Sequence, residues 1–259
     1  MKYFCILLLL LFYSTGIYAQ TKEGYIKKTD EKTNKVLYEG LFKNDKPAGK
    51  FKYYYPNDSV RAIVTFFPGG EKAYARLFHP NGKKMGEGKY VGKEVKDSVW
   101  TFYDELGTLI SRETYKNGKK EGPSYVYLPD GSVSQIRNFK DGVEHGPFKD
   151  FFGKDLVKAS GNYVNGHMEG RVSYYYPNGV EVAAGYYRNG LKNGAWIYKT
   201  EEGKIKEKEL YINGKLASPK ETDAFFSKNK FSDDKPAPGK SPRPAKKSSK
   251  QKRPVEADH

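Results

Sequence analysis

Cysteine and histidine, which supply most metal ligands and many nucleophiles, are almost missing from this chain. Its 259 residues include one cysteine, Cys5, near the N-terminus, so the rest of the chain can form neither disulfides nor cysteine-ligated metal sites. The four histidines do not recur as a set, and we predict that each lies on the solvated surface: His79, His145, His167 and His259. We therefore expect no catalytic residues, metal site or cofactor, and a protein that is not an enzyme.

Acid–base pairs are also lacking. Three glutamates lie beside the glycines of successive repeats, and we predict that they only flank turns: Glu121, Glu144 and Glu169. No two of them can be argued to serve as general acid and general base.

Long hydrophobic runs are absent except at the N-terminus. Lys2 precedes an apolar run that ends at Phe12, and a Ser/Thr/Gly stretch then leads to Ala19. This order is typical of a secretory signal peptide, and the run is shorter than the roughly 20 residues that span a bilayer. Cys5 lies too early in the run to be a lipid-attachment site. We predict that residues 1–19 are removed, that the mature chain begins at Gln20, and that the protein is exported to the periplasm, cell envelope or medium.

Apolar side chains are scarce again at the C-terminus. Residues 218–259 are rich in Lys, Pro and Ser, with eleven Lys/Arg against six Asp/Glu, within a chain of net charge +15. Such a composition buries too little surface to offset its ordering entropy, so we predict a disordered tail. In an exported protein, its charge favours contact with an anionic envelope or membrane surface over nucleic acid.

The intervening residues 20–217 contain a repeat of 24 residues, once of 25. Counted from each unit start, position 17 is always aromatic. The units start near Tyr25 and at Gly49, Ala73, Ser98, Gly122, Gly146, Gly170 and Gly194. The position-17 residues are Phe42, Phe66, Tyr90, Tyr115, Phe139, Tyr163, Tyr187 and Tyr211.

Two turn signals divide most of the units. Asn-Gly or Asp-Gly recurs at positions 8–9 and at 19–20, as in Asn178-Gly179 and Asn189-Gly190. These dipeptides tolerate the positive φ angles of two-residue primed turns, and β-branched and aromatic residues fill the segments between them. The pattern predicts an all-β fold: an elongated, single-layer antiparallel β-meander of about eight hairpins, or sixteen short strands.

The turns also predict the register. Position 2 should pair with position 15, and position 4 with position 13, so that one face carries large rings above small neighbours. Trp100 and Trp196 would lie on this structural face, near glycines such as Gly88 and Gly185.

The opposite face should be polar and basic, with one recurring aromatic residue at position 5. This row is the candidate ligand-binding site, together with three cations at position 3. Its members are Tyr54, Phe78, Tyr103, Tyr127, Phe151 and Tyr175, with Lys52, Arg76 and Lys149. The row would either shield the backbone or form a stacking platform for an extended ligand.

Three segments resemble the bacterial variant of the MORN repeat, whose pattern is aromatic-x-Asn-Gly-x-x-x-Gly-x-Trp-x-x-Tyr-x-x-x-Gly. They are "YKNGKKEGPSYVYLPDG", "YVNGHMEGRVSYYYPNG" and "YRNGLKNGAWIYKTEEG", starting at Tyr115, Tyr163 and Tyr187. The resemblance implies an elongated single-layer sheet used for binding or scaffolding. Some bacterial members carry a YwqK-type antitoxin label.

We therefore expect an exported, non-enzymatic binding or scaffold module for a protein partner or an anionic cell-surface polymer. Two alternatives stay open: an antitoxin-like protein-binding partner, and a structural protein whose sheet associates end to end with other copies. A choline- or glucan-binding repeat is less favoured because Trp100 and Trp196 are the only tryptophans.

Overall fold

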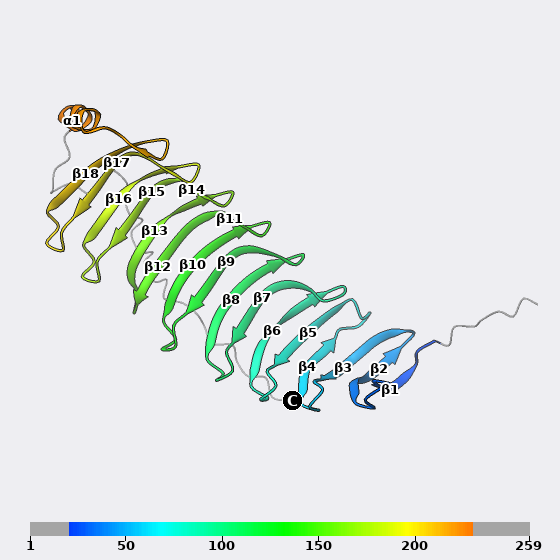
Figure 1. The fold of residues 1–259 in the computed structure, drawn as a ribbon. Helices are drawn as coiled ribbons and strands as arrows, with labels where there is room; N and C mark the ends of the chain where they lie inside the picture. Colours follow the sequence, from blue (N-terminus) through cyan, green and yellow to red (C-terminus); the bar gives the residue numbers. More distant parts are fainter. Residues whose placement is uncertain (1–20, 230–259) are drawn as a thin grey trace, which may run out of the picture.

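The computed structural model describes residues 21–229, which form one long, curved antiparallel sheet with a helix at its C-terminal end (Figure 1). Apart from three two-residue strands, each strand pairs with the long strands that precede and follow it in the sequence, so that β10 pairs with β12 and β13 with β15. The elements are β1 Gly24–Thr29, β2 Val36–Lys43, β3 Lys46–Tyr54, β4 Val60–Phe66, β5 Lys72–Phe78, β6 Lys84–Val91, β7 Val95–Tyr103, β8 Leu109–Lys116, β9 Lys119–Tyr127, β10 Val133–Lys140, β11 Val143–Glu144, β12 Gly146–Gly153, β13 Leu156–Val164, β14 His167–Met168, β15 Gly170–Tyr175, β16 Glu181–Arg188, β17 Leu191–Lys199, β18 Ile205–Ile212, β19 Lys215–Leu216 and α1 Pro219–Lys228.

The predicted meander is confirmed. Nineteen strands are present, and three of them have only two residues: β11, β14 and β19. The other sixteen are the predicted strands of eight hairpins. The predicted register is confirmed as well, since Phe51 pairs with Val64 and Trp100 pairs with Glu113.

The two turns differ in type in five of the eight units, although we expected primed two-residue turns at both. At positions 19–20 both residues have positive φ, as in Asn117 (50°) and Gly118 (79°). At positions 8–9 only the second does, as in Gly82 (81°), whose N–H donates to the His79 carbonyl. Pro80 suits this turn, because a proline ring fixes φ near −65° as the second position of a type I turn requires, but Gly107 and Gly203 close the same kind of turn without a proline.

The recurring unit glycine marks a β-bulge. Gly49, Gly122 and Gly194 have φ of 65°, 80° and 77°, and Ser98 adopts the same conformation at 59°. Ala73 does not, and β4 pairs with β5 without any shift of register. A glycine is needed where the bulge requires positive φ, and the unit that lacks the bulge has an alanine instead.

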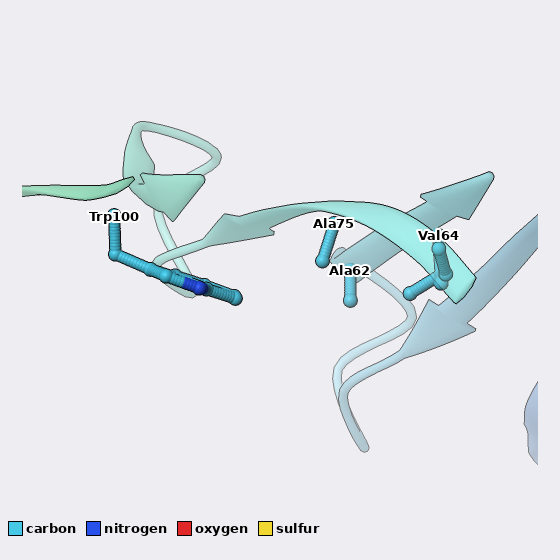
Figure 2. Packing of buried hydrophobic residues seen from close by; sticks show 5 residues of the cluster. Ala62, Val64, Ala75 and Trp100 are labelled. Atoms are coloured by element: carbon cyan, nitrogen blue, oxygen red, sulfur yellow. The ribbon is translucent and has the colours of Figure 1, made fainter. Parts of the chain in front are cut away.

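Large rings on one face of the sheet, which we call the core face, cover backbone that carries no side chain. A Cβ at Gly88 would lie 2.4 Å from the Trp100 ring, and one at Gly185 would lie 2.3 Å from the Trp196 ring. Trp100 is fully buried against Ala62 and Ala75, and Figure 2 shows these side chains on the same side of the strands. A single layer can thus bury whole rings, because each lies flat on its neighbours.

Lysines complete the burial of both tryptophans. Lys96 Nζ lies 5.1 Å from the Trp100 ring centre, and Lys192 Nζ lies 4.3 Å from that of Trp196. Burial lowers the pKa of Lys96. Cation–π contacts and the aliphatic lysine stems therefore close over rings that no second layer covers.

The middle of the core face is charged, which the repeat pattern did not predict. Arg137 contacts Asp150 at 2.6 Å and Glu144 at 3.4 Å, and Lys120 contacts Glu113 at 3.0 Å. These ion pairs separate an apolar cluster around Trp100 from another around Phe148. Glu144, expected only to flank a turn, is thus part of an ion-pair network.

Side chains also join successive hairpins at their turns. Glu121 and Glu169 accept backbone N–H groups of Asp141 (2.8 Å) and Asn189 (2.7 Å), as expected of turn-flanking groups.

Two histidines have a similar role, so the expectation that they are simply solvated is wrong. His145 Nδ1 accepts the N–H of Asn165 at 3.4 Å, and His79 Nε2 lies 3.0 Å from the Tyr103 carbonyl. Both are half-buried, whereas His167 is exposed. His259 lies outside the described residues.

The prediction that disorder begins at residue 218 is wrong for its first part, because α1 spans Pro219–Lys228. The Ser218 hydroxyl accepts the Glu221 N–H and the Glu221 carboxylate accepts the Ser218 N–H at 2.9 Å, which is a capping box. The helix packs on β18, where Lys208 Nζ lies 5.7 Å from the Phe226 ring centre. The expected signal peptide and the rest of the basic tail lie outside the described residues. Between residues 21 and 229, no helix has the length and hydropathy needed to span a membrane.

Candidate functional site

The six aromatic residues at position 5 lie on the strand that opens the hairpin in six of the eight units, and each is half-buried. Strand alternation places them opposite the core face, on what we call the polar face. They lie at the ends of β3, β5, β7, β9 and β15 and within β12: Tyr54, Phe78, Tyr103, Tyr127, Tyr175 and Phe151.

Tyr54 is tied to the nearest cation of the set through a carboxylate. Its hydroxyl donates to Glu39 Oε1 at 2.6 Å, and Lys52 Nζ lies 3.7 Å from the same oxygen. Burial and the bond to Glu39 raise the pKa of Tyr54 to about 12. The bond from Tyr54 in turn lowers the pKa of Glu39. The arrangement holds Tyr54 protonated and Glu39 charged at neutral pH.

Tyr103 belongs to a second cluster built in the same way. Lys84 Nζ lies 4.5 Å from its ring centre and 2.7 Å from Glu87 Oε1. The other oxygen of Glu87 lies 3.9 Å from Arg76 Nε. The hydrogen bond from Lys84 lowers the pKa of Glu87, while burial and Glu87 raise the pKa of the neighbouring Tyr74.

The remaining members share the face without a common cluster. Phe78 pairs with Lys84 in the ladder and so adjoins the Tyr103 cluster. Tyr175 pairs with Glu181, which binds Arg171 at 2.7 Å. Tyr127 and Phe151 pair with Val133 and Val157, and Lys149 is exposed. The structure thus brings Tyr54 together with Lys52, and Tyr103 with Arg76, but gives Lys149 only a place on the face.

The polar face is more evenly charged than expected. The carboxylates of Glu39, Glu87 and Glu181 each neutralise a basic side chain there. Sequence reasoning counted the cations and missed these partners, although Glu39 and Glu87 both occupy position 14 of their units and could have been found by it.

Two hollows lie at the N-terminal end of the sheet, on opposite faces. One, of about 240 Å³ on the core face, lies beside Tyr53, Leu77 and Tyr90. The other, of about 470 Å³ on the polar face, includes Phe67, Tyr74 and Arg76. Neither contains a nucleophile positioned beside a base. No group of three or more His, Asp or Glu side chains within residues 21–229 could hold a metal ion.

The fold and site together define a class of protein: a single-sheet hairpin repeat with two accessible faces. The MORN repeat variant model matches residues 96–117 and 192–213, and the MORN repeat model matches residues 38–60, 81–93 and 160–181. The chain therefore contains MORN repeats and variants of them. The two variant matches each contain one of the buried tryptophans, Trp100 or Trp196.

A search of curated proteins finds no match. Among solved structures, a point mutant of S. aureus TarM, in complex with fondaparinux, alpha-GlcNAc-glycerol and UDP, is similar over 57% of this chain. The identity is 9% and the TM-score 0.22, and the chain spans 21% of TarM. The match to a TcdB2-TccC3-Cdc42 structure covers 74% of this chain and 14% of the matched chain, with 12% identity and a TM-score of 0.19. The match to a porin-like protein from Bacteroides uniformis covers 76% of this chain and 93% of the matched chain, with 11% identity and a TM-score of 0.17. TM-scores this low say nothing about function.

Proposed function

We propose that the protein is a non-enzymatic binding module whose polar face holds an extended segment of a protein partner. The observation that carries the proposal is the row of half-buried aromatic residues, which recurs on the polar face from β3 to β15. A row of rings on every second strand of an open sheet offers repeated stacking positions along one line.

The state of the rings supports a binding role. Tyr54 is fixed by Glu39, and Tyr103 is covered by the Lys84 ammonium, so the rings are held in place before any ligand arrives. Rings that are already ordered lose little conformational entropy on binding. Four rings of the core face, Phe51, Trp100, Phe148 and Trp196, have almost no access to solvent, whereas others there, such as Tyr53 and Tyr90, are half-buried as well.

The charges favour a protein over an anionic polymer as the partner. Lys52, Arg76 and Arg171 are each bound to a carboxylate, so a polyanion would have to compete with Glu39, Glu87 and Glu181. A protein segment can instead use rings and mixed charges together. Anionic surfaces stay a proposal for the basic residues after 229.

Site-specific photocrosslinking tests the proposal in cells of the source organism. A crosslinking amino acid at Tyr127, on the polar face, should capture one defined protein. The matched control is Val126, the next residue on the same strand, which is 39% exposed on the core face. The combined change Tyr103→Ala, Tyr127→Ala and Tyr175→Ala should abolish the complex when the crosslinker is moved to Phe151.

Equal crosslinking from both faces, or none from Tyr127, would contradict the proposal. Salt-resistant binding to dextran sulfate that the triple change removes would instead identify the row as a polyanion site.

Export is the second part of the proposal, and the order of Lys2, apolar run and Ala19 supports it. N-terminal sequencing of the protein from the source organism should begin at Gln20. An intact Met1 in the cytoplasmic fraction would favour the antitoxin-like alternative.

A further inference from the structure

The polar face has a groove at its N-terminal end, over β3, β4 and β5. Its volume is about 470 Å³, and it is lined by Lys50, Ile63, Thr65, Phe67, Tyr74 and Arg76. Lys50, Thr65 and Tyr74 are direct cross-strand neighbours, and Ile63 lies opposite Arg76 in the next row. Apolar and aromatic side chains thus form the floor, and two cations border it.

The groove coincides with the irregular unit of the repeat. Ala73 replaces the unit glycine, and the ladder between β4 and β5 runs without the bulge found elsewhere. Side chains of these strands therefore stand directly opposite each other. Phe67, just beyond β4, is held by the hydrogen bond from its N–H to the Lys72 carbonyl at 2.9 Å, yet 42% of it is exposed.

The two cations are the least compensated on this part of the face. The Arg76 side chain is 60% exposed and lies at 3.9 Å from Glu87, which also binds Lys84 more closely. Lys50 is exposed and forms no ion pair with any described residue. A carboxylate of a ligand could bind Lys50 directly and would compete for Arg76 only with the 3.9 Å contact of Glu87, while an aromatic ring of the ligand could contact Phe67 and Tyr74.

At the opposite end of the sheet, an aromatic side chain of a helix contacts a lysine of this face. Helix α1 carries Glu221, Asp223, Phe225 and Phe226, and it packs on β18, where Lys208 lies over Phe226. Lys208 and Leu210 occupy positions 14 and 16 of their unit, the positions of Ile63 and Thr65 in the groove. Beside the helix Leu210 is only 8% exposed, whereas Thr65 is exposed.

We propose that this groove is the docking site for a partner segment in which an aromatic side chain is flanked by carboxylates. This inference rests on the proposed function and names the chemistry of its partner. The aromatic ring lies on Phe67 and Ile63, and the carboxylates bind Lys50 and Arg76. The groove would thus bind a segment of another protein that resembles α1, which packs on β18 within this chain.

A labelled synthetic peptide of residues 218–229, SPKETDAFFSKN, serves as the probe, with its binding to the full chain followed by fluorescence anisotropy. Phe67→Ser should weaken binding about tenfold, which corresponds to about 1.4 kcal/mol. Val164→Ser, at the same repeat position in another unit, should leave it unchanged. Arg76→Glu should weaken binding, and Lys28→Glu, its equivalent at position 3 of the first unit, should not. A peptide with alanine in place of both phenylalanines should not bind.

Equal affinity for the Phe67→Ser and Val164→Ser chains would overturn the inference. So would a concentration-dependent dimer that is lost on removal of α1, because the groove would then hold the helix of a second copy. If the peptide follows these expectations while Tyr127 crosslinks to nothing, the row is not the site but the groove is. If Tyr127 crosslinks to a partner but Phe67→Ser leaves the affinity for the peptide unchanged, only this inference fails.

Discussion

Both faces of the sheet carry recurring aromatic rings, but the surroundings of these rings differ between the faces. On the core face the Trp100 ring is fully buried, lies on Gly88 and is covered by Lys96. On the polar face Tyr54 stays half-buried, and its hydroxyl is held by Glu39. Rings of the first kind stabilise the fold, whereas rings of the second kind are ordered but accessible. If the polar face binds a partner as we propose, strand alternation alone separates the rings that stabilise the fold from the rings that bind.

The largest expected effect comes from the core face. Trp100→Ala should lower the free energy of unfolding by about 3–5 kcal/mol, because it leaves a cavity against Ala62 and Ala75. Urea unfolding followed by circular dichroism measures it. A loss below about 1 kcal/mol would show that the open sheet collapses onto the gap.

Alkaline pH should have the next largest effect, because many tyrosines act together. Burial raises the pKa values of Tyr53, Tyr74 and Tyr90 above the ordinary 10.0, and that of Tyr54 to about 12. The folded state binds these protons more tightly, so their contribution to stability is complete below pH 10 and falls as pH rises toward 12. Lys96, whose pKa is lowered, opposes this trend with one group. Circular dichroism and tyrosinate absorbance should change together; ionisation well before unfolding would contradict this account.

Gly88→Ala tests the contact on which the core face depends. The new Cβ would lie 2.4 Å from the Trp100 ring, and we expect a loss of about 1–3 kcal/mol in unfolding experiments. In a Trp100→Ala background the same change should be nearly neutral, because the clash is gone. An undiminished loss in that background would trace the effect to the backbone.

The C-terminal helix should contribute less. A chain ending at residue 217 loses the packing of α1 on β18, and we expect it to lose about 1 kcal/mol of stability. A chain ending at residue 229 keeps α1 and should be as stable as the full chain. Both should bind anionic vesicles more weakly at low salt, since both lack the basic residues beyond 229. Unfolding of either chain would contradict this division.

Most of the fold could be predicted because the turn signals recur at fixed positions and so determine which residues of neighbouring strands pair. Asn117-Gly118 and its equivalents set the hairpins, and Trp100 identified the core face. The bulges could not be predicted, because a glycine in a strand can mark either a bulge or a close contact with a neighbouring side chain. Ser98 adopts the bulge conformation although it is not a glycine. Helix α1 was missed because the basic residues that follow it dominate the composition of residues 218–259. Ser218 and Glu221 nevertheless have the spacing of a capping box, which predicts a helix start.

The candidate site could be predicted only in part. Position 5 identified the ring row, but Glu39 and Glu87 form the clusters through contacts with side chains on neighbouring strands. Such contacts depend on which strands are neighbours and on which rotamers the long side chains adopt. The position of a residue within the repeat does not determine either. The charged middle of the core face was missed for a related reason: Glu113 and Arg137 occupy position 15, where glycine is the commonest residue.

The measurement that tests the division between the faces most directly is the free energy of unfolding of the chain with Tyr103→Ala, Tyr127→Ala and Tyr175→Ala, beside that of Trp100→Ala. The account predicts that the three half-buried rings together cost less than the single buried tryptophan, while the triple variant loses its partner. A triple variant that is less stable than Trp100→Ala and still binds would show that the polar-face rings hold the sheet together and that the partner binds elsewhere.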